Sequence, residues 1–174
     1  MKIENPISLK AFESEMKQVD ALVHVLLKGH LLIEEALSRI IEQYVFHAEH
    51  LREARLTFNQ KLLVARALCL RKARLGEWEL LTALNKLRNE IAHKLQSGER
   101  DKKVGRVKAL YFREAPLGSE LSRAKKLPDE TIILNACAHC YGFLGRFLTD
   151  SRSFRGIIHS LDRGLNPNLP PFDL

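Results

Sequence analysis

The stretch LNKLRNEIAHKL, residues 84–95, decides the expected fold. Its apolar residues recur at spacings of three and four, as in an amphipathic helix. With a turn of about 100° per residue, the apolar side chains within about 60° of Leu84 form a predicted core stripe: Leu80, Leu84, Leu87, Ile91 and Leu95. We therefore predict a helix over residues 77 to about 96, ended by the serine–glycine pair at 97–98.

Similar patterns predict that most of the chain is helical. The predicted helices cover residues 8 to about 47 with a bend at Gly29, residues 57 to 73 with Thr57 or Asn59 as the cap, and residues 128 to about 150. RVKALYF, residues 106–112, is predicted as a short strand or helix. The expected fold is all-α, an antiparallel four- to five-helix bundle. It forms one domain over residues 1–150, with a basic insert at about 97–127 and a C-terminal extension at 151–174.

Composition points to a globular protein of the cytoplasm. Hydrophobic residues make up 45% and charged residues 28% of the 174 residues, as in ordinary globular domains. No apolar run approaches the ~20 residues needed to cross a bilayer, and the N-terminus does not read as a signal peptide, so we expect no membrane partner. The three cysteines are an odd number in apolar surroundings, which argues against disulfides.

The remaining motifs predict no cofactor and no metal. CAHC, residues 137–140, lacks the further ligands of a zinc site, so both cysteines are interpreted as core residues. The histidines outside residues 84–95 are scattered and show no metalloprotease spacing.

Positive charge is concentrated directly after residues 84–95. Ten basic and four acidic residues lie within 94–126, a difference of +6 in a chain of net charge +7. One interpretation is a solvated, mobile loop. The other is a nucleic-acid-binding segment, because lysine and arginine neutralise the phosphate backbone. The candidate RNA-binding residues are Lys94, Arg100, Lys102, Lys103, Arg106 and Lys108.

A third strip of the predicted helix carries no charge. It lies beside the core stripe and consists of Trp78, Asn85, Asn89, Ala92 and Gln96. Depletion of charge around an aromatic anchor is typical of an interface centre, so we predict a two-fold dimer that forms through this helix. The alternative is that Trp78 covers one end of the core. Arg88 and His93 diverge by about 140° on one helix, and a two-fold seam would let residues from two copies converge in one cleft.

RNEIAH, residues 88–93, resembles the R-x4-6-H signature of the HEPN superfamily, including the polar residue after the arginine. GHLLIEEALSRII, residues 29–41, resembles the early helix of that family, which packs against the motif helix. The resemblance covers roughly residues 8–148. It implies a metal-independent RNA endonuclease that acts as a homodimer, often as a toxin or in antiviral defence, with an antitoxin or regulatory protein as a further partner. As the second interpretation, it implies an inactive RNA- or protein-binding module like the mannitol-operon repressor family.

The resemblance also implies roles for individual residues. His93 would serve as general base or acid, Arg88 would hold the phosphate, and Asn89 would orient the histidine or the backbone. Glu34 is a supporting candidate, because a pair with Arg88 would fix the guanidinium; the alternative is an exposed Glu34.

A helix-turn-helix that binds DNA is another interpretation of LRKARLGEWELLTALNKLRN, residues 70–89. Its second helix would leave few basic residues for a DNA groove.

Overall fold

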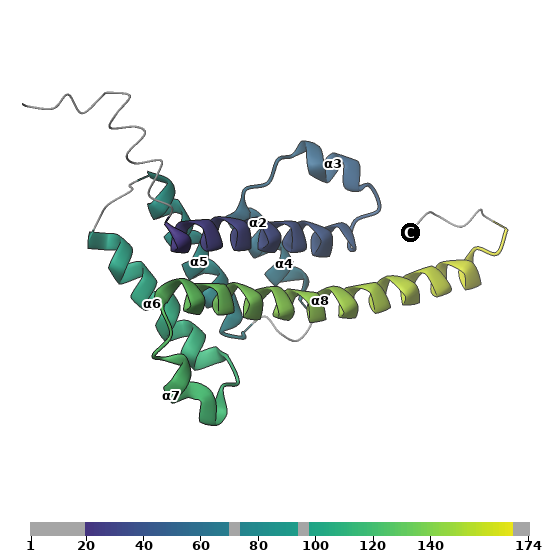
Figure 1. Cartoon of the computed structure of the whole chain (residues 1–174). Helices are drawn as coiled ribbons and strands as arrows, with labels where there is room; N and C mark the ends of the chain where they lie inside the picture. The colour runs from purple at the N-terminus through teal and green to yellow at the C-terminus, as the bar shows by residue number, and fades with distance from the viewer. Residues whose placement is uncertain (1–19, 70–73, 94–97, 169–174) are drawn as a thin grey trace, which may run out of the picture.

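The computed structural model describes residues 20–69, 74–93 and 98–168, and every regular element within them is a helix (Figure 1). The all-α prediction is therefore confirmed. In chain order the elements are α2 (Ala21–Glu42), α3 (Ala48–Glu53), α4 (Phe58–Leu68), α5 (Glu77–His93), α6 (Gly98–Glu114), the 3-10 turn η1 (Gly118–Glu120), α7 (Leu121–Ala124) and α8 (Asp129–Leu165). No helix in the described part of the chain combines the length and the apolar character needed to cross a membrane.

The helices α2 and α8 lie side by side and run in the same direction (Figure 1). Gly29 of α2 packs against Cys137, and the Ser151 hydroxyl donates a hydrogen bond to the Tyr44 hydroxyl at 3.2 Å, so residue numbers rise together along both helices. The prediction of an antiparallel arrangement is wrong for this pair. The five α-helices described between α2 and α8, from α3 to α7, supply a connection long enough to return the chain to its starting end.

The helices α5 and α6 pack antiparallel to each other. Glu79 near the start of α5 pairs with Arg113 near the end of α6 at 2.5 Å, and Glu90 near the end of α5 pairs with Lys103. The buried residues of α6 are Val104, Val107, Leu110 and Tyr111. The segment predicted as a basic insert therefore contributes a helix to the hydrophobic core, and the interpretation as a mobile loop is wrong.

Several predicted ends are corrected by local contacts. Helix α2 begins after Asp20, whose carboxylate accepts a hydrogen bond from the Val23 amide at 3.1 Å, passes Gly29 without a break and ends at Glu42. Residues 8–19 lie outside the described part. Thr57 caps α4 in a capping box with Gln60, which settles the choice between Thr57 and Asn59.

The last helix continues about four turns beyond its predicted end at residue 150. Ser151 is buried, and the guanidinium of Arg155 donates hydrogen bonds to the carbonyls of Glu42, Gln43 and Val45. These carbonyls lie at the end of α2 and just beyond it, where helical hydrogen-bond partners are missing. The predicted boundary between a domain and a C-terminal extension therefore falls inside α8.

Replacing Gly29 by valine is expected to lower the free energy of unfolding by about 1–3 kcal/mol, the usual cost of overpacking a core. A Cβ atom at this position would lie 2.7 Å from Sγ and 2.9 Å from Cβ of Cys137. The matched control is Gly105→Val in α6, where a Cβ would meet no atom within 4 Å. Urea unfolding of both variants checks the prediction, and equal stabilities would contradict it.

Candidate functional site

Helix α5 carries the RNEIAH motif, residues 88–93, in its last turns. The described residues of the predicted stripe, Leu80, Leu84, Leu87 and Ile91, are buried. Arg88 is half-buried at the shoulder of this stripe, and Asn89 beside it is exposed. Arg88 Nη1 donates a hydrogen bond to Asn89 Oδ1 at 3.3 Å. His93 is the last residue of α5, and its side chain lies outside the described part of the structure.

The guanidinium of Arg88 makes no ion pair with a carboxylate among residues 20–69, 74–93 and 98–168. A half-buried charge normally has a partner, because removal from water penalises an isolated ion. Asn89 supplies only a neutral amide oxygen. The arrangement leaves Arg88 with capacity to bind an anion in its fork-shaped donor geometry.

The predicted pair between Glu34 and Arg88 is wrong. Glu34 Oε1 instead accepts a hydrogen bond from Lys61 Nζ at 2.8 Å, and both side chains are half-buried. Helix α4 packs along α2 and brings Lys61 to the carboxylate, so Glu34 is neither fully exposed nor available as the main partner of Arg88.

A buried histidine of α2 joins the surroundings of Arg88. His30 Nε2 lies 3.0 Å from Asn85 Oδ1 of α5, and its ring stacks on Phe58 of α4 with centroids 4.2 Å apart. Burial lowers the pKa of His30, and the positive charge of Arg88 lowers it further, whereas the Asn85 hydrogen bond and the charge of Glu34 act in the opposite direction. The amide oxygen only accepts hydrogen bonds, so in the neutral ring Nε2 carries the proton.

The sequence contains a signal for His30 that our prediction did not use. His30 occupies the same helical stripe as Leu26, Ile33 and Leu37, all of which are buried. A histidine at such a position must find a polar partner inside the protein. Here that partner comes from the motif helix, one turn before Arg88.

Lowering the pH is expected to destabilise the protein over the pH range in which His30 becomes protonated. Because the pKa of His30 is lower in the folded protein, the unfolded chain binds a proton at this residue more readily. The contribution of neutral His30 to the free energy of unfolding is therefore present above its ordinary pKa of 6.5 and is lost as the pH falls below that value. Urea unfolding at pH 7.5 and 5.5 should show a decrease in wild type that is smaller in His30→Leu. The pKa values of three carboxyl groups are also lowered, those of Asp20, Glu79 and Glu99. They change the stability only below their ordinary pKa values near 4, so they do not affect this comparison. Identical pH dependence of the two proteins would contradict the assignment to His30.

The residues of the predicted interface strip have different environments in the structure. Trp78 is only 1% exposed and packs edge-on against Phe143 and Phe147 of α8, with ring centroids 5.2 and 6.2 Å away. Its prediction as an interface anchor is therefore wrong, and the alternative of a core role holds. Asn85 is bonded to His30. Asn89 and Ala92 remain exposed, and Gln96 lies outside the described residues.

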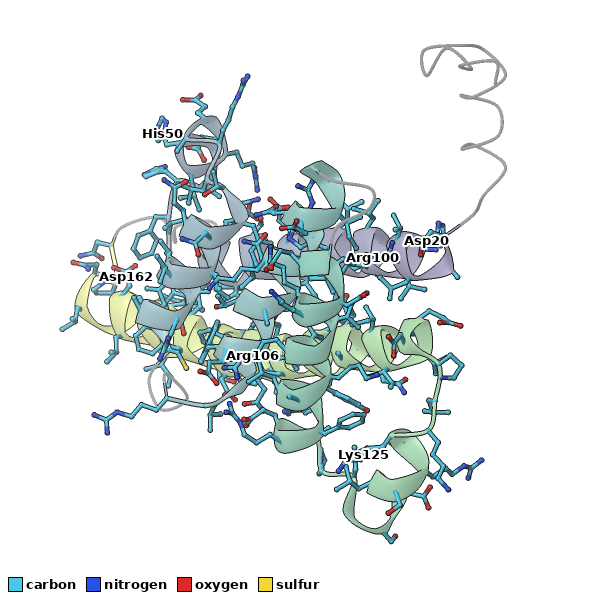
Figure 2. All side chains as sticks on the ribbon, turned by 90° about the vertical axis from the view of Figure 1, so that its left-hand side faces the viewer. Asp20, His50, Arg100, Arg106, Lys125 and Asp162 are labelled. Carbon is cyan, nitrogen blue, oxygen red and sulfur yellow. The ribbon has the colours of Figure 1, made fainter. Side chains whose placement is uncertain are left out.

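The predicted RNA-binding residues of α6 are all paired with acids. Lys94 lies outside the described part. The other pairs are Arg100–Asp20 at 2.6 Å, Lys102–Glu99 at 2.7 Å, Lys103–Glu90, Arg106–Glu79 at 3.6 Å and Lys108–Asp129 at 2.6 Å. Figure 2 shows Arg100 beside Asp20 at one end of α6 and Arg106 further along the helix. These pairs compensate much of the positive charge counted in the sequence.

The cysteines of CAHC are core residues, as predicted. Cys137 and Cys140 are buried, and burial raises the pKa of Cys137 to about 12 and that of Cys140 well above its ordinary value. Such thiols stay protonated at neutral pH and are poor nucleophiles.

Comparison with known proteins identifies no family and no relative of this chain. The chain matches no protein-family model, and no match was found among curated proteins or solved structures.

Proposed function

We propose that the chain is a metal-independent RNA endonuclease of the HEPN type that acts as a homodimer, as a toxin of a toxin–antitoxin pair or as a defence protein. The observation that carries the proposal is the half-buried guanidinium of Arg88, which forms no ion pair within the described residues. A guanidinium that is held beside an amide and left without a carboxylate suits a phosphodiester. The intact R-x4-H spacing from Arg88 to His93 supports the same interpretation.

The proposed reaction is an internal transfer in the RNA strand. The His93 imidazole accepts the proton of a ribose 2′-hydroxyl, whose oxygen attacks the adjacent phosphorus. The bond from phosphorus to the 5′-oxygen breaks, and that oxygen takes up a proton from water or from the protonated imidazole, leaving a 2′,3′-cyclic phosphate on one product. An ordinary histidine pKa of ~6.5 suits this proton transfer near neutral pH. Arg88 stabilises the charge that develops on the phosphate oxygens, and Asn89 helps to fix its position.

The positions of Arg88 and His93 along α5 support the proposed homodimer. Arg88 and His93 are five residues apart on α5, and their positions diverge by about 140° around the helix axis. These two register positions fall on different sides of α5 in one copy, and two copies related by a two-fold axis would bring position 88 of one near position 93 of the other. Asn89 and Ala92 are the described exposed residues through which α5 would form this seam.

RNA cleavage in excess chelator tests the proposal. The purified protein should cut a single-stranded RNA in EDTA, leave a cyclic phosphate detectable by mass spectrometry, and fail to cut the same strand with 2′-O-methyl riboses. Light scattering should give the mass of two chains. Cleavage that requires an added divalent cation, or a strictly monomeric active protein, would overturn it.

A second candidate function is a non-catalytic module that binds RNA or a protein partner, as in the mannitol-operon repressor family. The specific observation in its favour is the pairing of each described basic candidate on α6 with an acidic side chain. Such pairing weakens the attraction for a polyanion, so it favours the form of this module that binds a protein partner. This function predicts binding of a partner without cleavage by wild type.

A further inference from the structure

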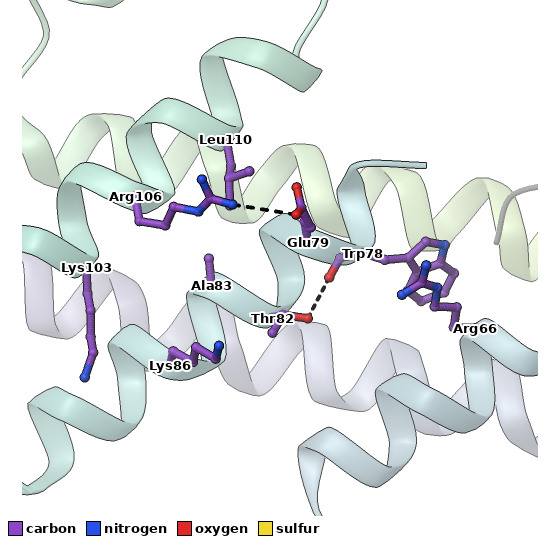
Figure 3. Close-up of a pocket in the computed structure, with 9 residues that line it drawn as sticks. All are labelled: Arg66, Trp78, Glu79, Thr82, Ala83, Lys86, Lys103, Arg106 and Leu110. Atoms are coloured by element: carbon purple, nitrogen blue, oxygen red, sulfur yellow. Dashed lines mark hydrogen bonds and ion pairs between the residues drawn. The ribbon is translucent and has the colours of Figure 1, made fainter. Parts of the chain in front are cut away.

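A cavity of about 210 Å³ opens between α4, α5 and α6 (Figure 3). Four cationic side chains from these three helices line it: Arg66, Lys86, Lys103 and Arg106. Glu79 is the one acidic lining residue and Trp78 contributes to the wall, so the lining charge is four minus one, or +3. The sequence did not reveal this cluster, because two of its cations lie outside the basic run.

The positive charge of this cavity is only partly compensated. Glu79 is shared, because it pairs with Arg106 at 3.6 Å and with Arg113 at 2.5 Å. The hydrogen bond from Arg113 lowers the pKa of Glu79 most, and the charges of Arg113, Arg106 and Arg66 lower it further. Lys86 is exposed and makes no ion pair within the described ranges. Lys103 pairs with Glu90, which does not line the cavity. An anion in the cavity would therefore chiefly meet Lys86 and Arg106, whose partner Glu79 is shared with Arg113.

The size of the cavity restricts the ligand. Pockets for drug-sized molecules and cofactors usually measure about 300–1,000 Å³, which is more than this cavity offers. A phosphate group with part of its sugar is a better match. Lysine and arginine are the usual residues that contact phosphate oxygens.

The cavity lies on the same strip of α5 as two motif residues. Counting about 100° per residue, Glu79, Lys86 and Asn89 occupy positions within about 40° of the register position of His93. Lys86 precedes His93 by seven residues, which is on the order of 10 Å along the helix. An RNA strand that follows α5 from the motif would reach the cavity within a few nucleotides.

We propose that this cavity is a subsite for a backbone phosphate of the RNA strand, next to the position where the strand is cut. The inference rests on the proposed function, because it takes the strand to pass Asn89 and His93. Lys86 and Arg106 hold the phosphate oxygens, and Glu79 limits the affinity by competing for Arg106.

Binding of a 2′-O-methyl RNA strand, followed by fluorescence anisotropy at several salt concentrations, tests the subsite without cleavage. Lys86→Gln should weaken binding about three- to tenfold and reduce the salt slope by about 0.7, the value for one phosphate contact to a single strand. The matched control is Lys125→Gln, which removes an exposed lysine beside α7, away from Arg106 (Figure 2).

A variant that binds RNA more tightly provides a second test, because a misfolded protein would bind more weakly. Glu79→Gln removes the competing carboxylate and should tighten binding several-fold with a steeper salt slope. Its control is Glu120→Gln, which makes the same change in net charge at η1, where Glu120 pairs only loosely with Arg123 at 3.9 Å. Thermal melting should show that all four variants remain folded.

The outcomes separate the subsite from the nuclease. Wild type that binds the methylated strand but does not cut its 2′-hydroxyl counterpart would refute the proposed function and leave the subsite standing. Wild type that cuts RNA while Lys86→Gln and Glu79→Gln bind like their controls would refute the subsite alone. Absence of RNA binding by wild type would refute the subsite as well.

Discussion

Replacement of Arg88 by alanine should reduce RNA cleavage by at least 10²-fold, the usual effect of removing one group that stabilises a developing oxyanion. The fold should tolerate the change, because Arg88 forms no ion pair among the described residues and its hydrogen bond to Asn89 is exposed. Arg88→Lys should recover only part of the rate, since a lysine keeps the charge but lacks two parallel donors. Rates are measured on a fluorescent RNA under single-turnover conditions in EDTA.

The same variant has a structural signature that does not depend on activity. The charge of Arg88 contributes to the lowered pKa of His30, so Arg88→Ala should raise that pKa, as followed by NMR titration of the imidazole. The matched control is Arg39→Ala, which removes an exposed arginine that pairs with Glu35 on α2. Arg39→Ala should leave both cleavage and the His30 titration unchanged. Undiminished cleavage by Arg88→Ala would show that the activity comes from elsewhere.

The sequence predicted those features that depend on one helix alone. The start of α5 at Glu77 and the buried Leu84 and Ile91 follow from local periodicity, which residues close in sequence determine. The environment of Trp78 could not be predicted from this local pattern. Its angle around the helix places it beside the core stripe, but only the packing of α8 against that side decides that it is buried.

Features that need contacts between distant residues could not be read from the sequence. Arg100 and Asp20 are 80 positions apart in the chain, and nothing local indicates that they pair. The count of basic residues therefore overestimated the free positive charge on α6. The continuation of α8 past residue 150 also depends on a distant partner, because Arg155 binds carbonyls at the end of α2.

Replacement of Trp78 by alanine should lower the free energy of unfolding by about 3–5 kcal/mol, as for other large aromatic side chains removed from cores. That is a large share of the roughly 5–15 kcal/mol that stabilises a typical domain. Trp78 is 1% exposed and contacts Phe143 and Phe147, so its removal leaves a cavity between α5 and α8. Urea unfolding followed by circular dichroism measures the loss.

Dependence on protein concentration distinguishes this core role from the interface role that the sequence suggested. Loss of a core residue destabilises each chain, so Trp78→Ala should lower stability by the same amount in dilute and concentrated samples, whereas loss of an interface anchor would chiefly weaken dimerisation. The control is Tyr141→Ala on α8. Tyr141 is 47% exposed, and its replacement should cost under about 1 kcal/mol. Trp78 is the single tryptophan, so its emission in wild type should resist acrylamide quenching until the chain unfolds. Ready quenching in the native protein would contradict its burial against α8.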